Sequence, residues 1–453
     1  MSRISFHPSI LREYDIRGVV GETLFEEDAY WIGRCFGQKI KDVSGKAVAV
    51  GWDGRLSSPQ LAGALMRGLC ASGLKVYSLG VGPTPLLYFA EYTLPVEGAI
   101  MVTGSHNPPS HNGFKMSLKR APFFGQDIQS FAHLQHGDAQ EGVTHVIDLR
   151  EGYADRLMTG LDFDKSLAIV WDPGNGATCD VLKMLLPRLP GRHVVLNEEM
   201  DGTFPAHPPD PSNPQNLVQL QAAVVENRCD FGIAFDGDGD RLVAVDGKGR
   251  ILWGDQLLTL FAVDLLTRHP QSAILGDVKV GQGFFDEVKR LGGMPLMGKT
   301  GHSHIKAKMA ESDILLAGEM SGHFFFKENY YGFDDGMYAA MRLLHLLSHS
   351  PQTLAELYDY LPFFASTPEL QIACDPARKF IIPQEIGARL RAAGQPFSDI
   401  DGVRVQLETG WWLVRASNTQ DLLVARCEAY RETDLAQVKA HMERELRASG
   451  VVV

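Results

Sequence analysis

Short apolar runs recur along most of the chain, and each stops abruptly at a polar loop rich in glycine. Gly98–Val102 passes directly into residues 103–108, and Phe231–Phe235 passes into residues 236–241. Runs of about four to eight apolar residues that end at turn residues are typical of strands buried in a sheet. The pattern therefore predicts buried strands whose ends carry loops of unusual composition.

Stretches with helical spacing of leucine and valine separate these runs. An earlier apolar run, Ala47–Val50, is followed by Leu61, Leu65 and Leu69 at helical spacing. Ser57 with Pro59 marks the start of that helix, since serine suits the N-cap and proline the first turn. Strands that alternate with helices predict largely parallel sheets covered by helices, which is the α/β class. Three successive segments follow this order, so we expect three related α/β domains. Ligands bind at the carboxyl ends of parallel strands, so the unusual loops are expected to share one cleft.

The last part of the chain has a different pattern. Residues 403–407 and 411–414 alternate around Glu408, Thr409 and Gly410, which predicts a hairpin, and residues 434–448 have helical spacing. A smaller α+β domain is expected here. The four expected domains are residues 1–152, 153–255, 256–365 and 366–453.

Composition and charge restrict the range of functions. The 453 residues are 45% hydrophobic and 22% charged, as in ordinary globular proteins, and no run of about 18 apolar residues would span a membrane. The net charge of −12 argues against nucleic acid as a partner. The six cysteines are widely spaced and the first residues have no secretory pattern, which indicates free thiols in the cytoplasm.

The loop at residues 236–241 has the composition of a metal site. Asp236, Asp238 and Asp240 alternate with glycine, and three carboxylates in one tight turn suit a hard divalent cation such as Mg²⁺. An EF-hand is excluded, because Arg241 occupies the sixth position, where glycine is needed, and Gly247 the twelfth, where glutamate is needed. A solvated acidic turn is the alternative.

The loop at residues 103–108 offers a nucleophile. Ser105 follows a glycine at the end of a strand, with His106 and Lys115 nearby in the sequence. A serine hydroxyl needs a neighbouring base or metal to act as a nucleophile. A plain turn is the competing interpretation, because glycine, serine, asparagine and proline are also the common turn residues.

Two further loops suit a sugar phosphate. Glu319 and Ser321 are spaced to point the same way in an extended segment, which suits hydrogen bonds to sugar hydroxyls. Arg415 has the planar fork that phosphate oxygens accept, and neutral donors follow it. These donors are Ser417, Asn418 and Thr419. Tyr14 and Arg17 stand just before a glycine break near the start of the chain, and Lys279 and His302 are expected on loops at the same end of the strands.

Taken together, the motifs resemble those of the α-D-phosphohexomutase family over nearly the whole chain. They occur in one order, as Glu-Tyr-Asp-Ile-Arg-Gly at residues 13–18, Thr-Gly-Ser-His-Asn-Pro at 103–108, Asp-Gly-Asp-Gly-Asp-Arg at 236–241, Gly-Glu-Met-Ser-Gly-His at 318–323 and Arg-Ala-Ser-Asn-Thr at 415–419. They are most similar to the bacterial phosphomannomutase/phosphoglucomutase branch. Met320 departs from the glutamine that is typical of the phosphoglucosamine mutase branch.

The resemblance implies a mutase that moves a phosphoryl group between C1 and C6 of a hexose phosphate. Ser105 would carry the phosphoryl group, and Mg²⁺ would lie between it and Asp236, Asp238 and Asp240. Arg241 and Lys115 would contact the transferring group. The resemblance further implies that Glu319, Ser321 and His323 read sugar hydroxyls, and that Arg415, Ser417, Asn418 and Thr419 hold the second phosphate. A hexose 1,6-bisphosphate would be the intermediate and activator, and a monomer is expected.

Some alternatives stay open at this point. Arg17, Lys115, His106 and His323 are unranked candidates for accepting the hydroxyl proton. A phosphatase of the haloacid dehalogenase type would use Asp236 as its nucleophile, but it leaves Ser105 without a role. A sugar-phosphate-binding protein without catalysis is the other alternative.

Overall fold

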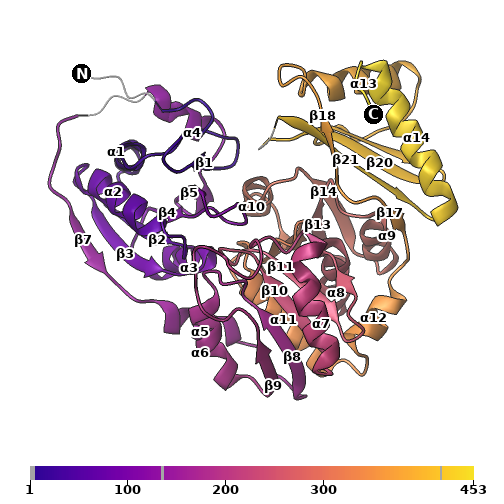
Figure 1. Ribbon diagram of the computed structural model, residues 1–453, viewed down its shortest axis with the longest axis horizontal. Helices are drawn as coiled ribbons and strands as arrows, with labels where there is room; N and C mark the ends of the chain where they lie inside the picture. Colours follow the sequence, from indigo (N-terminus) through magenta and orange to yellow (C-terminus); the bar gives the residue numbers. More distant parts are fainter. Residues whose placement is uncertain (1–5, 134–136, 419–420) are drawn as a thin grey trace. The chain divides into compact units, whose positions relative to one another are not determined.

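In the computed structural model, the α/β domains predicted from the sequence contain sheets whose two faces are covered by helices (Figure 1). The structure describes residues 6–133, 137–418 and 421–453. Contacts divide the chain into two units, the first of residues 1–257 with 321–359 and the second of residues 258–320 with 360–453. Each unit is described by itself below.

The first sheet of unit 1 has the strand order β1-β5-β4-β2-β3-β7, in which β2, β3, β4 and β7 run parallel and β5 is antiparallel to β4 and β1. Its elements are β1 (Ile16–Val19), α1 (Glu26–Asp42), β2 (Ala47–Trp52), α2 (Ser58–Cys70), β3 (Lys75–Val81), α3 (Thr84–Thr93), β4 (Gly98–Val102), β5 (His111–Leu118), β6 (Ala121–Pro122), α4 (Gln126–Gln129) and β7 (Val143–Val146).

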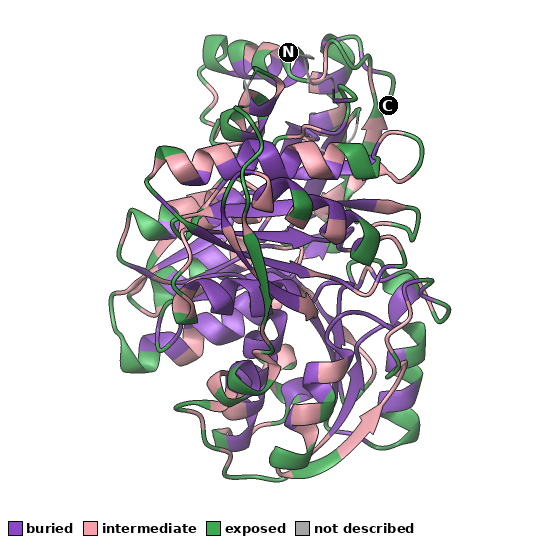
Figure 2. Cartoon of the chain, turned by 90° about the vertical axis from the view of Figure 1, so that its left-hand side faces the viewer, coloured by how far each residue is buried: buried purple, intermediate pink, exposed green. Residues whose placement is uncertain are grey.

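Apolar side chains that point alternately to the two faces of the central strands explain why this sheet is buried on both faces. Val48 and Val50 of β2 pack into the core under α1 and α2, whereas Ala49 between them packs into the core under α3. Successive side chains of a strand point to opposite faces, so an all-apolar strand requires a covering layer on each side. Figure 2 shows the consequence, because buried residues run along the central strands while exposed residues gather on helices and loops. The edge strand β7 is exposed along its length.

The second sheet of unit 1 has the order β12-β11-β10-β8-β9. Its elements are α5 (Arg150–Met158), β8 (Leu167–Asp172), α6 (Cys179–Leu185), β9 (Gly191–Val195), α7 (Val218–Glu226), β10 (Phe231–Phe235), β11 (Leu242–Asp246) and β12 (Ile251–Leu252). The strands β9, β8 and β10 are parallel, and β11 returns antiparallel to β10. Unit 1 also contains β16 (Phe324–Phe326) and α11 (Gly336–His349).

Unit 2 contains the parallel strands β14-β13-β15 and a separate antiparallel sheet, β17-β21-β20-β19, with β18 beside β21. The first group comprises α8 (Gly254–Arg268), which begins in unit 1, β13 (Ala273–Asp277), α9 (Gln282–Arg290), β14 (Met294–Gly298), α10 (His302–Ala310) and β15 (Ile314–Gly318). The second comprises β17 (Ala365–Ser366), β18 (Leu370–Ala373), α13 (Ile381–Ala392), β19 (Val403–Leu407), β20 (Gly410–Ala416), β21 (Leu422–Ala429) and α14 (Glu432–Ala448). The boundary between the units in the sequence falls within α12 (Leu354–Tyr360). The predicted hairpin and final helix are therefore confirmed.

The predicted start of α2 is confirmed, with proline in its first turn. Ser57 is the N-cap residue of α2, but its side chain makes no capping hydrogen bond. Its hydroxyl accepts from Asn112 Nδ2 at 2.9 Å, and the next serine, Ser58, donates to Asp53 Oδ1 at 2.5 Å. The two serines thus serve tertiary contacts, which a local capping pattern cannot reveal. All six cysteines are free thiols, as predicted. Among the described residues no helix has the length and apolar character needed to cross a membrane.

Close contact between α1 and α2 depends on glycine. A Cβ atom on Gly68 would lie 2.0 Å from the carbonyl oxygen of Tyr30, whereas one on Gly63 of the same helix would lie 3.7 Å from its nearest neighbour. We expect Gly68→Ala to lower the free energy of unfolding by about 1–3 kcal/mol, because the helices must move apart. Gly63→Ala should raise it by up to about 1 kcal/mol, because alanine favours the helix.

Thermal unfolding of the two variants beside the wild type measures both effects. Equal midpoints for Gly68→Ala and Gly63→Ala would contradict this account of the helix packing.

Candidate functional site

Ser105 lies in the loop that follows β4, at the carboxyl end of that strand. Its backbone has a φ of 48°, in the left-handed region that side chains other than glycine rarely adopt. The residue is only 2% exposed, yet its hydroxyl faces a polar neighbour, because Oγ donates to Asp236 Oδ2 at 3.0 Å. Strained backbone of this kind persists only where surrounding contacts enforce it. Those contacts come from residues that follow the neighbouring strand β2.

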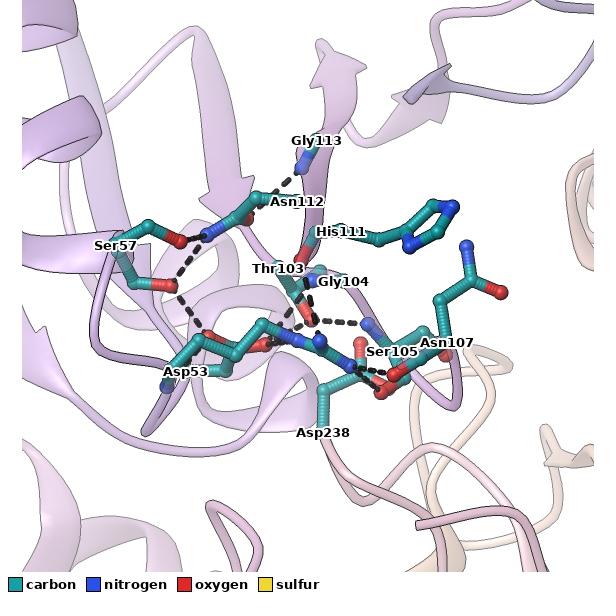
Figure 3. A network of polar contacts seen from close by, with 12 residues as sticks. Asp53, Ser57, Thr103, Gly104, Ser105, Asn107, His111, Asn112, Gly113 and Asp238 are labelled. Atoms are coloured by element: carbon teal, nitrogen blue, oxygen red, sulfur yellow. Dashed lines mark hydrogen bonds and ion pairs between the residues drawn. The ribbon is translucent and has the colours of Figure 1, made fainter. Parts of the chain in front are cut away.

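Asp53 and Arg55, which the sequence analysis did not select, hold the serine loop in place. Asp53 Oδ2 accepts from the hydroxyl of Thr103 at 2.7 Å and from the backbone N–H of Gly104 at 3.1 Å (Figure 3). Arg55, 1% exposed, donates to the Ser105 and Asn107 carbonyl oxygens, both at 2.6 Å. It also reaches the carbonyl oxygens of Pro108 and His111.

The sequence did contain a sign that these two residues matter: Asp53 and Arg55 follow a predicted strand, the position at which ligand-binding loops of α/β sheets lie. What the sequence did not reveal is that β2 lies beside β4 in the sheet. Without that adjacency an aspartate and an arginine after one strand have no connection to a serine fifty residues later.

The aspartate loop lies between β10 and β11, and all three carboxylates are fully buried. Asp236, Asp238 and Asp240 are each 0% exposed, and their ligand oxygens lie within 4.8 Å of one another. Glycine lets this loop approach the serine loop, because a Cβ atom on Gly237 would lie 2.5 Å from the carbonyl oxygen of Ser105. The structure thus brings the predicted nucleophile and the predicted metal loop together.

Lys115 supplies the nearest positive charge. It lies on β5, opposite Met101 of β4, and its Nζ donates to Asp238 at 2.7 Å and to Asp240 at 2.5 Å. Burial alone would lower the pKa of Lys115, but the surrounding carboxylates raise it above its usual value. Thr84, the first residue of α3, adds two bonds to Asp238, one from its hydroxyl at 2.5 Å and one from its N–H to the carbonyl oxygen at 2.8 Å.

The carboxylates are left with more negative charge than Lys115 neutralises. Burial and the charges of Asp238 and Asp240 raise the pKa of Asp236 well above its usual value. Burial would also raise the pKa of Asp238, but Lys115 lowers it below the ordinary range. Asp238 Oδ1 is buried and has no hydrogen-bond partner among the residues described. An all-oxygen donor set with an unsatisfied buried carboxylate oxygen fits Mg²⁺.

Arg241 and His323 border the aspartate loop. Arg241 Nε donates to His323 Nε2 at 3.0 Å and lies 3.8 Å from Asp236 Oδ2. With Nε2 as acceptor, the imidazole proton of His323 is on Nδ1, which lies 3.1 Å from Asp334 Oδ2 and 3.5 Å from Asp240 Oδ1. The bond from Arg241 therefore sets the tautomer of His323, and Asp334, which lies in no motif recognised from the sequence, places a carboxylate beside the protonated nitrogen.

The remaining candidates of unit 1 lie on either side of the serine loop. His106 Nδ1 lies 3.4 Å from Asp210 Oδ2, and burial together with Arg241 lowers the pKa of His106. Arg17 of β1 pairs with Asp15 and donates to the Thr103 carbonyl oxygen at 3.3 Å. Tyr14 is half-buried just before β1.

Unit 2 contains its own group of candidates near the ends of β13, β15 and β20. Glu319 follows β15, is 1% exposed and accepts from the N–H of Gly301 at 2.6 Å, which positions it beside the start of α10 at His302. Lys279 Nζ lies 3.1 Å from Glu369 Oε2. Ser321 and His323 of the same motif belong to unit 1.

Arg415 at the end of β20 is anchored by an acidic partner. Its Nε lies 3.0 Å from Asp401 Oδ2, and the same carboxylate oxygen accepts from the N–H of Thr300 at 3.1 Å. Ser417 donates its N–H to the Leu422 carbonyl oxygen at 3.0 Å, closing the turn between β20 and β21. Asn418 lies in this turn, and Thr419 lies outside the described residues.

Family models match the chain along nearly its whole length. They are described as phosphoglucomutase/phosphomannomutase, alpha/beta/alpha domain I at residues 8–130, domain II at 151–249 and domain III at 253–363, with the C-terminal domain at 369–445. This chain belongs to the phosphoglucomutase/phosphomannomutase family. The predicted resemblance and fold class are therefore confirmed.

Individual relatives support the same assignment. A phosphomannomutase/phosphoglucomutase of Pseudomonas aeruginosa is 42% identical over 443 residues, which cover 97% of this chain and 96% of the relative. A phosphoglucomutase of Neisseria gonorrhoeae is 40% identical over 437 residues, 95% of each chain. The crystal structure of a phosphoglucomutase/phosphomannomutase family protein from Burkholderia thailandensis has a TM-score of 0.92 at 40% identity and covers 98% of each chain.

The role of Arg55 in this family member can be tested directly. Arg55→Lys keeps a charge beside Asp53 but has too few donors for the carbonyl oxygens of the serine loop. We expect a loss of about 1–3 kcal/mol in the free energy of unfolding and faster amide exchange in residues 103–111, since buried carbonyls lose partners. Hydrogen exchange by mass spectrometry measures the second effect. Arg67→Lys is the control, because that side chain is 64% exposed; an unchanged loop in Arg55→Lys would refute the role.

Proposed function

We propose that this chain interconverts hexose 1-phosphates and hexose 6-phosphates, of mannose, glucose or both, with Ser105 as the phosphoryl carrier. Its family and the names of its relatives support the activity of an intramolecular phosphotransferase. One observation supports the carrier above the others: the Ser105 hydroxyl lies 3.0 Å from Asp236 within a buried group of three carboxylates. A phosphoryl group carried there would lie beside carboxylates that can hold Mg²⁺ and beside Lys115, and phosphoryl transfer depends on such positive charge.

Asp236, Asp238 and Asp240 would hold Mg²⁺, with the phosphate of Ser105 completing the site. When bound, the ion would neutralise charge on the phosphoryl oxygens. Lys115 and Arg241 supply further positive charge. The raised pKa of Lys115 keeps its proton in place, so it fits charge neutralisation better than proton acceptance.

The reaction proceeds in two transfers. The phosphoryl group leaves Ser105 Oγ for the free hydroxyl of a hexose 1-phosphate, whose proton passes to a side chain, and a hexose 1,6-bisphosphate forms. After the bisphosphate turns end for end, its other phosphoryl group returns to Ser105 Oγ, and the hydroxyl that it leaves regains a proton. The same bisphosphate would restore the phosphoserine of an enzyme that has lost it. Phosphoryl transfer depends mainly on positioning and charge.

A side chain must accept the hydroxyl proton. His106 fits this role through its lowered pKa, which keeps the imidazole neutral near pH 7. Arg17 and His323 remain candidates, because both lie close to the serine and aspartate loops.

The other candidates would bind the rest of the substrate. Glu319, Ser321 and His323 would read sugar hydroxyls, and Arg415, Ser417, Asn418 and Thr419 would hold the phosphate that is not reacting. The ion pair with Asp401 fixes the plane of the Arg415 guanidinium, which suits recognition of a phosphate by its planar fork. Tyr14, Arg17, Lys279 and His302 would line the site. We also expect a cytoplasmic monomer.

The alternatives receive less support. A phosphatase with Asp236 as nucleophile leaves Ser105 without a role, although the hydroxyl of Ser105 donates to Asp236 at 3.0 Å. A binding protein without catalysis would not need a serine held in strained backbone against three carboxylates. Neither function is named among the relatives compared above.

Replacing Ser105 tests the carrier. We expect Ser105→Ala to lower turnover of glucose 1-phosphate by several orders of magnitude, because the variant lacks the oxygen that would carry the phosphoryl group. Intact-mass analysis of the wild type should reveal a species about 80 Da heavier, one phosphate ester, that Ser105→Ala lacks. Ser110→Ala is the control, because Ser110 lies exposed in the same loop. Turnover at the wild-type rate in Ser105→Ala would end the proposal.

A second experiment tests substrate choice. The bisphosphate must bind in two orientations, so groups that read the sugar should depend on hydroxyls at C3 and C4 and not at C2. We therefore expect glucose 1-phosphate and mannose 1-phosphate, which differ only at C2, to have similar kcat/KM. A ratio above about 10³, equivalent to about 4 kcal/mol of discrimination, would contradict this.

A further inference from the structure

A group of histidine and aspartate side chains lies in unit 1, outside the site described above. His345 and His349 lie one turn apart near the carboxyl end of α11, with ring centroids 4.4 Å apart. Asp162 and Asp164 lie in the segment between α5 and β8. The two segments are already tethered there, because Lys165 Nζ donates to the carbonyl oxygen of Ser350. None of these residues takes part in the proposed phosphoryl transfer.

Backbone contacts set the protonation of both imidazole rings. His345 Nδ1 lies 2.8 Å from the carbonyl oxygen of Asp162, and His349 Nδ1 lies 2.9 Å from the carbonyl oxygen of His345. A carbonyl oxygen only accepts, so each Nδ1 carries a proton. In the neutral rings Nε2 then has the lone pair. Histidines that bind metals commonly donate their second nitrogen to a backbone carbonyl or carboxylate in this way, which orients the ring.

Carboxylate oxygens converge on the lone-pair nitrogen of His349. Its Nε2 lies 3.5 Å from Asp162 Oδ1 and 3.5 Å from Asp164 Oδ2. His345 supports the site without being a ligand, because its protonated Nδ1 lies 3.3 Å from Asp162 Oδ1 and holds that carboxylate in place. A lone pair that faces carboxylate oxygens is repelled unless positive charge lies between them. Only a proton on His349 or a bound cation supplies that charge.

The spacing of these atoms favours a metal. Donors held at about 2.0–2.1 Å from a tetrahedral Zn²⁺ lie about 3.3 Å from one another. The contacts of 3.5 Å between His349 and the two carboxylates need only small side-chain movements to meet this geometry. Asp162 and Asp164 are 76% and 68% exposed in their side chains, so an ion can enter from solvent and retain a water ligand.

We propose that Asp162, Asp164, His345 and His349 form a binding site for Zn²⁺ or a similar transition-metal ion. Imidazole and carboxylate donors together suit zinc, nickel, cobalt or copper, whereas Mg²⁺ prefers oxygen ligands alone. The site thereby differs in chemistry from the three-aspartate loop. Its ligands come from two segments more than 180 residues apart in the sequence, so a bound ion would join α11 to the segment before β8. Ligand binding of this kind stabilises the folded state.

The test is zinc titration of the full chain by calorimetry at pH 7.5, with saturating Mg²⁺ to occupy the aspartate loop. We expect the wild type to bind about one zinc ion per chain at this site. His349→Gln should weaken that affinity at least about 10-fold, because it removes the nitrogen ligand. His345→Gln should weaken it by a similar factor, because His345 positions Asp162. The control is His269→Gln, an exposed histidine in unit 2, which should bind like the wild type.

Two further measurements locate the ion. Zinc should raise the midpoint of thermal unfolding in the wild type and in His269→Gln, but not in the double variant His345→Gln/His349→Gln. Circular dichroism without zinc confirms that the double variant is folded; both positions lie near the helix end and are partly exposed. Absence of zinc binding in the wild type would overturn the proposal. Binding that survives in both histidine variants but is lost in Asp238→Asn would place the ion at the aspartate loop and would also overturn it.

Discussion

The structure of unit 1 depends on the burial of negative charge beside one hydroxyl group. Asp236, Asp238 and Asp240 are removed from water, and desolvation of carboxylates is costly unless positive charge or hydrogen bonds compensate for it. Lys115 compensates for part of this charge through Asp238 and Asp240. The negative charge that remains is the physical reason why the loop suits a divalent cation. A phosphorylated Ser105 beside such a cation would be placed for phosphoryl transfer.

Much of the surrounding structure keeps the two loops in contact. Ser105 remains in left-handed backbone because Arg55 holds its carbonyl oxygen and Asp53 holds the N–H of Gly104. Gly237 gives the aspartate loop room to approach. These contacts join residues that follow different strands, so the geometry of the two loops results from the order of strands in the sheets. The sites of unit 2 follow the same principle, because Glu319 and Arg415 lie at strand ends and are each held by a partner from a neighbouring loop.

Sequence reasoning was most successful where a residue's role follows from its immediate neighbours. The runs that became β4, β10 and β15 and the loops that follow them were recognised because apolar strands and glycine-rich turns have local signatures. The local pattern located the start of α2 at Ser57, but it did not reveal that the Ser57 side chain contacts Asn112. The sequence analysis missed Thr84, Asp210 and Asp334. Each contributes through a contact with a group outside its own segment, and such contacts have no local pattern. The expected domain boundaries and the roles of individual residues stay predictions.

The sequence by itself determined the class of fold, the family and the candidates for the reactive groups, because periodicity and short motifs are properties of consecutive residues. Only the tertiary structure decided which groups meet. The pairing of Ser105 with Asp236, of Arg55 with the serine loop, and of His349 with Asp162 and Asp164 all join segments far apart in the chain. Such pairings follow from strand order and helix packing, which minimise the free energy of the whole unit and leave no signature in any single segment.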